Sequence, residues 1–259
     1  VNGMMFDHNP NSNLAETLKY GKTFSTKAMQ EKYGYILSNN GNRLAEIGAK
    51  LEKGKKIPAI VFMHGCGGFY SSMMGIFRNF ENSGIEMVML APNSFGRNRP
   101  IACPGTNQWN SFLEPSYAFR SAELDHAMSE LLKHDFIDRK KVFLMGHSQG
   151  GATIADYDPG DHGIGLRGRI YSSGACLAFK GSYGTGSYIG RDEESFLLIS
   201  KNDPWDVLRN GTIGCDRFAK TRHYVEEPFH TVLAWEKYGA ILNKWMRAHL
   251  KRYVIRDDG

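Results

Sequence analysis

A serine between glycines is the sharpest chemical signal in the sequence. Residues 146–150 read Gly-His-Ser-Gln-Gly and directly follow the apolar run 142–145. This G-x-S-x-G pattern is typical of a nucleophile on a tight turn between a strand and a helix. Glycines are needed there because side chains at the flanking positions would collide with the strand and the helix. Ser148 is therefore the candidate nucleophile, and the following helix would point its N-terminus at negative charge developing beside it.

A second glycine-rich loop follows an earlier apolar run. Residues 64–68 read His-Gly-Cys-Gly-Gly and come directly after the run 57–63. In hydrolases with this kind of serine turn, such a loop supplies a backbone N–H to the substrate oxygen. We therefore expect the backbone N–H groups of Cys66 and Gln149 to form an oxyanion hole. A phosphate-binding loop is the alternative, but the spacing G-x-x-x-x-G-K-[ST] and its lysine are missing.

A nucleophilic serine needs a general base and an acid that orients the base, here in the chain order serine, acid, histidine. Asp203 stands just after an apolar run and is the expected acid, with Asp206, three residues further, as the alternative. His230 stands in the loop before the last helical segment and is the expected base. His147 adjoins the nucleophile, and we expect it to line the pocket or pack rather than act as the base.

Apolar runs and helical patterns alternate from residue 57 onward. The expected strands are 57–63, 85–92, 142–145, 168–172, 196–200 and 221–226, and the expected helices are 72–83, 116–134 and 234–250. Fully apolar strands that alternate with helices predict an α/β fold with a parallel sheet covered on both faces. Such sheets place their sites at the carboxyl ends of the strands. The three candidate catalytic residues all fall there.

Length and composition fit one domain. The chain has 259 residues, with no repeat and no long linker. We expect an N-terminal arm over residues 1–33 and a single catalytic domain over residues 34–259. The sequence contains no run of about 18 apolar residues, so we expect no membrane span. The charge of +5 lies in short clusters, which argues against a nucleic-acid partner. The acidic segment 156–163 lacks calcium-loop spacing, so we expect no metal and no cofactor.

Taken together, these motifs resemble the dienelactone hydrolase family of α/β-hydrolases. The resemblance covers about residues 40–250 and rests on the segments 64–68, 93–97, 146–151, 203–205 and 228–230. It implies a mostly parallel sheet of about eight strands with helices on both faces. It also implies that residues 43–52 form an early strand, although their composition favours a helix. Founding members of the family use a cysteine where this chain has Ser148, and Asn93 replaces the usual aspartate.

The resemblance gives the four cysteines an interpretation. Some presumed exported relatives carry cysteines at similar places, which implies the disulfides Cys66–Cys103 and Cys176–Cys215. The protein would then be periplasmic or secreted. Four free thiols would instead indicate the cytoplasm.

The leading hypothesis is a serine hydrolase that cleaves a small carboxylic ester or lactone through an acyl-enzyme. Phe69, Tyr70, His147 and Trp205 are candidates to line its pocket, although aromatic side chains at such places also pack in cores. A peptidase or acyltransferase with the same residues is the first alternative. A catalytically silent binding protein of the same fold is the second, but it would not need the serine, the acid and the base together.

Overall fold

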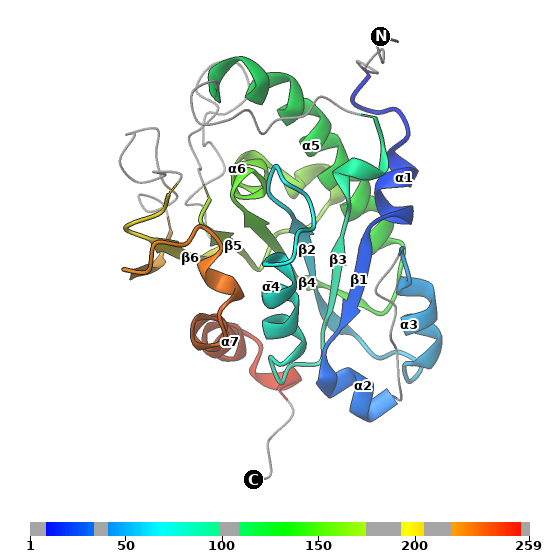
Figure 1. Ribbon diagram of the computed structural model, residues 1–259. Helices are drawn as coiled ribbons and strands as arrows, with labels where there is room; N and C mark the ends of the chain where they lie inside the picture. The colour runs from blue at the N-terminus through cyan, green and yellow to red at the C-terminus, as the bar shows by residue number, and fades with distance from the viewer. Residues whose placement is uncertain (1–8, 34–40, 99–108, 175–192, 205–218, 255–259) are drawn as a thin grey trace.

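The computed structural model describes residues 9–33, 41–98, 109–174, 193–204 and 219–254, with the backbone alone for 109–115. The strands are β1 Lys22–Ser25, β2 Ile57–Met63, β3 Val88–Ala91, β4 Ile137–His147, β5 Gly168–Ser172, β6 Glu194–Ser200 and β7 Thr221–Val225. Among the described residues they form one seven-stranded sheet in the order β1-β3-β2-β4-β5-β6-β7. All neighbours are parallel except β1, which pairs antiparallel with β3 (Figure 1).

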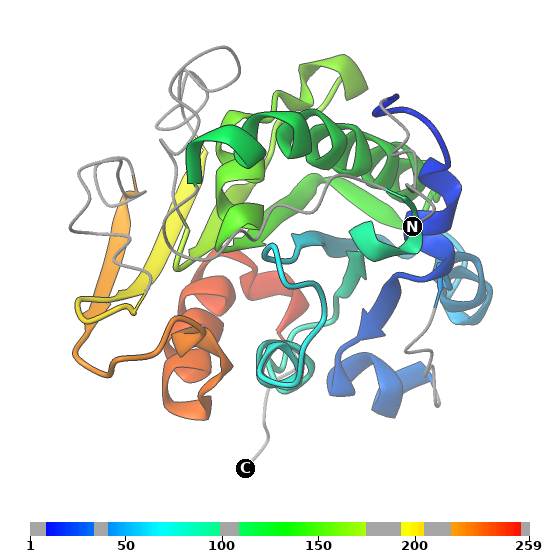
Figure 2. The same cartoon turned by 45° about the horizontal axis from the view of Figure 1, so that its top comes forward.

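Helices cover both faces of the sheet (Figure 2). The α-helices are α1 Leu14–Lys19, α2 Lys27–Tyr33, α3 Leu44–Lys50, α4 Met73–Glu81, α5 Trp109–Leu132, α6 Gln149–Asp156 and α7 Glu236–His249. Short 3₁₀ turns are η1 Ser94–Gly96, η2 Pro159–His162, η4 Val232–Ala234 and η5 Lys251–Tyr253. The helices α5 and α6 pack on one face, while α4 and α7 pack on the other. The predicted parallel sheet between two helical layers is therefore confirmed.

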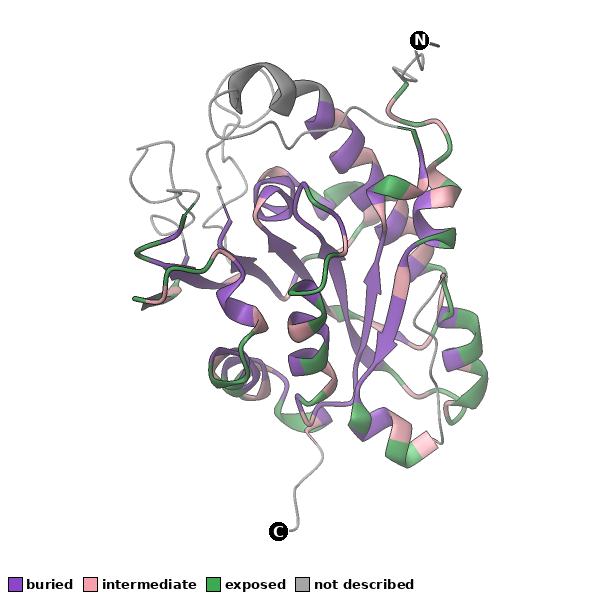
Figure 3. Ribbon diagram, in the orientation of Figure 1, coloured by how far each residue is buried: buried purple, intermediate pink, exposed green. Residues whose placement is uncertain are grey.

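Strand β2 shows why the sequence folds into these layers. Every residue of the strand is buried (Figure 3). Ala59 and Val61 pack into the core under α5, whereas Ile60 and Phe62 pack into the core under α4. Alternate side chains of a strand point to opposite faces, so an apolar run serves both cores.

The strand predicted for residues 43–52 is wrong, because Leu44–Lys50 form helix α3. Leu44 and Ile47 are buried in the core, while Ala45 and Glu46 are exposed. Buried positions three residues apart lie on one side of a helix. The local helix propensity gave the correct structure, and the resemblance did not.

The N-terminal residues take part in the sheet. Residues 22–25 form the antiparallel edge strand β1, with Thr23 opposite Leu90 of β3. Helix α1 lies against the segment after β3, because the Thr17 carbonyl accepts a hydrogen bond from the Asn93 backbone N–H at 2.8 Å. None of the described helices combines the length and apolarity that a membrane crossing needs.

Candidate active site

Ser148 stands on the sharp turn that the sequence predicts. It lies between strand β4 and helix α6, with φ 52° and ψ −119°. A positive φ is rare for a residue with a side chain, and strained backbone of this kind recurs at active sites. The backbone N–H of Ser148 donates to the Ser172 carbonyl at the end of β5, at 3.0 Å. The turn is thereby fixed to the centre of the sheet.

Two glycines make this turn possible. A Cβ on Gly146 would lie 2.3 Å from the Gly150 carbonyl oxygen, and one on Gly150 would lie 2.0 Å from the Met63 carbonyl oxygen. Both separations are far below contact distance. The glycines at these positions therefore allow α6 to pack directly over β4 and β2, as the pattern requires.

Asp203 and His230 meet across two neighbouring loops. Asp203 follows β6, and His230 lies between β7 and η4. The ring Nδ1 of His230 donates to the carboxylate of Asp203, at 2.8 Å from Oδ2 and 3.0 Å from Oδ1. The side chain of Asp203 is 1% exposed and that of His230 is 13% exposed. With its proton on Nδ1, the neutral ring presents Nε2 as a proton acceptor.

Backbone contacts hold these loops in place. The Ser200 hydroxyl donates to the Glu227 carbonyl at 2.5 Å, and the Asn202 amide donates to the Glu226 carbonyl at 2.7 Å. The Ser173 hydroxyl donates to the His230 carbonyl. The acid loop and the base loop are therefore tied to each other and to the end of β5.

Ser148 and His230 line one cavity of about 260 Å³. The other described residues in its wall are Gly65, Cys66, Gly67, Tyr70, His147 and Thr231. The structure thus brings the predicted nucleophile, the predicted base and the predicted oxyanion loop to one opening.

A chain of hydrogen bonds crosses the cavity wall. His147 Nδ1 lies 3.1 Å from the Ser172 carbonyl oxygen, which can only accept, so Nδ1 carries the proton. His147 Nε2 then accepts from the Tyr70 hydroxyl at 3.0 Å. Because that hydroxyl has one proton, the Thr231 hydroxyl donates to it in turn, also at 3.0 Å. These contacts fix Tyr70 beside the residue that follows His230.

His147 is a buried neutral histidine beside the candidate base. It is fully buried, and its ring centroid lies 4.9 Å from that of His230. Burial, and then the nearby His230, holds the pKa of His147 well below its ordinary value. His147 therefore stays uncharged at neutral pH. It lines the cavity without competing for the proton of Ser148.

Of the two expected oxyanion donors, Cys66 lines the cavity, and Gln149 directly follows Ser148, which also lines it. Gln149 is the first residue of α6, where backbone N–H groups lack partners within the helix. The side-chain amide of Gln149 donates to the Ser116 hydroxyl at 3.0 Å, which holds the start of α6 against α5.

The remaining predictions have mixed outcomes. Phe69 packs edge-on against His64 and Phe77, with ring centroids 5.0 Å and 5.7 Å apart. Trp205 and Asp206 lie outside the described residues. Cys66 is buried and is not a free thiol, but the other three cysteines also lie outside the described residues. Both disulfide pairings therefore stay predictions.

The sequence patterns missed several positioning residues. Ser173 and Thr231 hold the base loop and the cavity wall. Ser173 stands just after a predicted strand, and that position could have identified it as a candidate site residue. Arg120 and Glu123 form a buried ion pair beneath the loop that follows β2. Their spacing of three on a helix looks like an ordinary surface pair.

Comparisons with known proteins place the fold. No protein-family model matches the chain, and no curated protein matches it. Est1E from Butyrivibrio proteoclasticus has 14% identity and a TM-score of 0.51, over 77% of this chain and 90% of that one. A putative dienelactone hydrolase from Klebsiella pneumoniae subsp. pneumoniae has 17% identity and a TM-score of 0.53, over 78% and 90%.

The dienelactone hydrolase-like promiscuous phosphotriesterase P91 from metagenomic libraries is similar at the same level. It has 16% identity and a TM-score of 0.52, over 78% of this chain and 88% of that one. At such identities the similarity concerns the fold, and function must be argued from the site. The described sheet and its helical layers agree with these neighbours, and the chain therefore has the α/β-hydrolase fold.

Proposed function

We propose that this protein hydrolyses carboxylic esters or lactones of small molecules, with Ser148 as nucleophile, His230 as general base and Asp203 as the acid. One relationship carries the proposal. Ser148 and His230 line the same cavity, and the Asp203 carboxylate accepts a hydrogen bond from Nδ1 of His230. Similarity to a putative dienelactone hydrolase supports the same chemistry at the level of fold.

The first half of the reaction follows from this arrangement. The Ser148 hydroxyl attacks the ester carbonyl carbon while His230 Nε2 takes its proton. The buried carboxylate of Asp203 stabilises the positive charge that forms on the ring. The backbone N–H groups of Cys66 and Gln149 stabilise the negative charge on the former carbonyl oxygen. The ester C–O bond then breaks, and the alcohol leaves with the proton from His230.

The second half frees the enzyme. His230 takes a proton from a water molecule, whose oxygen attacks the acyl carbon of the Ser148 ester. The second tetrahedral adduct collapses, Ser148 regains its proton from His230, and the carboxylic acid leaves.

We propose further that the protein is periplasmic or secreted. This proposal depends on the two disulfides, since such bonds persist in oxidising compartments.

Labelling of the nucleophile tests the function without knowledge of the natural substrate. A fluorophosphonate probe should modify Ser148, as located by peptide mapping, and turnover of p-nitrophenyl acetate and butyrate should disappear in Ser148→Ala. The variant His230→Ala should label far more slowly, because it lacks the base. Failure to label Ser148, with no serine-dependent ester turnover, would favour a silent binding protein. Faster cleavage of amides than of esters would favour a peptidase.

A further inference from the structure

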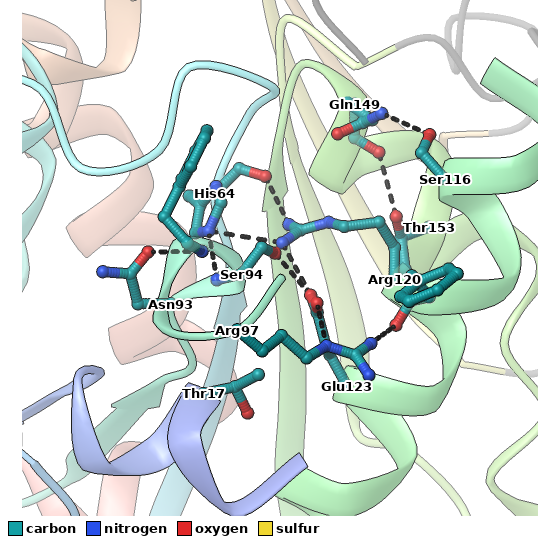
Figure 4. A network of polar contacts seen from close by, with 12 residues as sticks. Thr17, His64, Asn93, Ser94, Arg97, Ser116, Arg120, Glu123, Gln149 and Thr153 are labelled. Atoms are coloured by element: carbon teal, nitrogen blue, oxygen red, sulfur yellow. Dashed lines mark hydrogen bonds and ion pairs between the residues drawn. The ribbon is translucent and has the colours of Figure 1, made fainter. Parts of the chain in front are cut away.

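A buried polar network lies next to His64, two residues before Cys66 in the sequence (Figure 4). The Glu123 carboxylate accepts from Arg97 Nε at 3.1 Å, from Arg120 Nη1 at 2.9 Å and from the Ser94 hydroxyl. The side chains of Arg97, Arg120 and Glu123 are all 0% exposed. His64, at the end of β2, is fully buried at the edge of this network.

The partners of His64 determine where its proton lies. Its Nε2 accepts from the Ser94 backbone N–H at 3.0 Å, and Arg120 Nη1 lies 3.3 Å from the same nitrogen. Both partners are donors, so Nε2 carries no proton and the neutral ring is protonated on Nδ1. The Nδ1–H then donates to the Gly65 carbonyl oxygen at 2.5 Å.

These contacts fix two successive peptide groups. Arg120 Nη2 donates to the His64 carbonyl at 2.5 Å, and His64 Nδ1–H holds the Gly65 carbonyl. In a trans peptide the carbonyl and the next N–H point in opposite directions. The Gly65 carbonyl faces His64, so the Cys66 N–H faces away from it. Cys66 lines the cavity together with Ser148.

Stability alone does not account for the network. Buried ion pairs contribute little net stability, because desolvation of the charges offsets their attraction. This network instead ends on the carbonyl groups of the two residues before Cys66. Catalytic donors act strongly when they are held in place before the charge develops.

We propose that His64, held by Arg120 and Glu123, is a positioning residue that aims the Cys66 N–H at the oxyanion. The inference rests on the proposed ester hydrolysis and adds a specific requirement to it. His64 neither touches the substrate nor exchanges protons. The Gly65 carbonyl accepts from His64 Nδ1–H at 2.5 Å and from the Gly68 backbone N–H at 3.2 Å, and loss of the shorter bond should slow the chemical step more than it weakens substrate binding.

Two variants of His64 test the roles of its two ring nitrogens separately. In His64→Asn the amide N–H can replace Nδ1–H and hold the Gly65 carbonyl. In His64→Gln the longer side chain can replace Nε2 as the acceptor for Ser94 but cannot hold that carbonyl. We expect kcat on p-nitrophenyl acetate to fall by about 10²-fold in His64→Gln, with KM changed by less than about threefold. His64→Asn should retain kcat within about tenfold of the parent.

Inhibitors provide a second measure. A trifluoromethyl ketone forms a tetrahedral adduct that carries the oxyanion, so its affinity should fall in parallel with kcat across the two variants. The unreactive substrate analogue, a methyl ketone, should bind all three proteins with similar affinity. His249→Gln is the matched control and should leave kcat and both affinities unchanged, because His249 lies on α7 and its Nδ1 contacts the Trp245 carbonyl rather than the network.

One measurement needs no variant. Long-range ¹H–¹⁵N spectra of the unmodified protein should show His64 as a neutral ring protonated on Nδ1. A ring protonated on Nε2 would overturn the proposal, as would equal losses of kcat in His64→Asn and His64→Gln. Failure of the proposed function is distinguishable, because the parent protein would then show no Ser148-dependent turnover, and the inference would fall with it.

Discussion

Both carboxylate oxygens of Asp203 accept from Nδ1–H of His230, at 2.8 Å and 3.0 Å. A carboxylate that only accepts fixes the ring tautomer, and it does so from a position that is 1% exposed. The orientation of the candidate base therefore depends on a charge, not only on shape.

Asp203→Asn should lower kcat by about 10⁴-fold with little change in KM, because an asparagine amide can donate to Nδ1 and so favours the wrong tautomer. Initial rates on p-nitrophenyl butyrate provide the measurement. Asp206→Asn is the matched control and should retain most of the activity. The reverse order of effects would make Asp206 the acid.

His147 should contribute to the loss of stability in acid. Its folded-state pKa is depressed, so the unfolded chain binds the proton more tightly than the folded one. The free energy of unfolding should therefore be constant above about pH 6.5 and fall as the pH drops below it, by at most about 1.4 kcal/mol per pH unit from this group. Urea unfolding between pH 7.5 and 5 should show a steeper decline in the parent than in His147→Gln. Parallel declines would contradict the assignment.

Tyr70→Phe should affect both stability and catalysis. It leaves Nε2 of the buried His147 without its donor, which should cost about 1 kcal/mol in the free energy of unfolding. Because Thr231 loses its partner too, the loop of His230 should shift and kcat should fall by about tenfold. Denaturant melts and initial rates measure the two effects. Tyr224→Phe, an exposed position on β7, should change neither.

Gly150→Ala should be strongly destabilising, by about 3 kcal/mol or more, or prevent folding. The new methyl group would lie 2.0 Å from the Met63 carbonyl oxygen, and neither β2 nor α6 can move apart without disrupting the core. Gly165→Ala is the control, since nothing lies within 4 Å of its added Cβ. Thermal unfolding of the two variants makes the comparison. Similar midpoints would contradict the close contact between α6 and β2.

The cysteine pairing is open to direct measurement. Thiol titration with Ellman's reagent under denaturing, non-reducing conditions should find no free thiols among the four cysteines. Peptide mapping without reduction should then yield the pairs Cys66–Cys103 and Cys176–Cys215. Four free thiols would refute both pairings and remove the argument for export, and other pairs would correct the connectivity.

The sequence predicts the site better than it predicts the surroundings of the site. Ser148 and Asp203 each follow an apolar run, His230 follows a predicted strand, and the carboxyl ends of parallel strands converge on one edge of the sheet. Strand order did not need to be known for this conclusion. The error over residues 43–52 arose where local preference and resemblance disagreed, and Leu44 and Ile47 show that the helical period was already present.

The buried network next to His64 could not be predicted in the same way. Arg120 and Glu123 lie on a helix, where charged residues three positions apart are common on surfaces. Arg97 and Ser94 come from a different segment, the turn after β3. Only the packing of α5 against that turn brings these side chains together and excludes water. Contacts between distant segments leave no periodic trace in a single sequence.

The ties between the acid loop and the base loop have a mechanical consequence. Ser200 and Asn202 bind the carbonyl groups of Glu227 and Glu226, so the strand ends of β6 and β7 form one rigid platform. Ser148 is held by the same platform, because its backbone N–H binds the Ser172 carbonyl at the end of β5 and the Ser173 hydroxyl binds the His230 carbonyl. The nucleophile and the base are therefore kept at one separation through β5. A bulky substrate would have to fit the cavity without moving the imidazole away from the nucleophile.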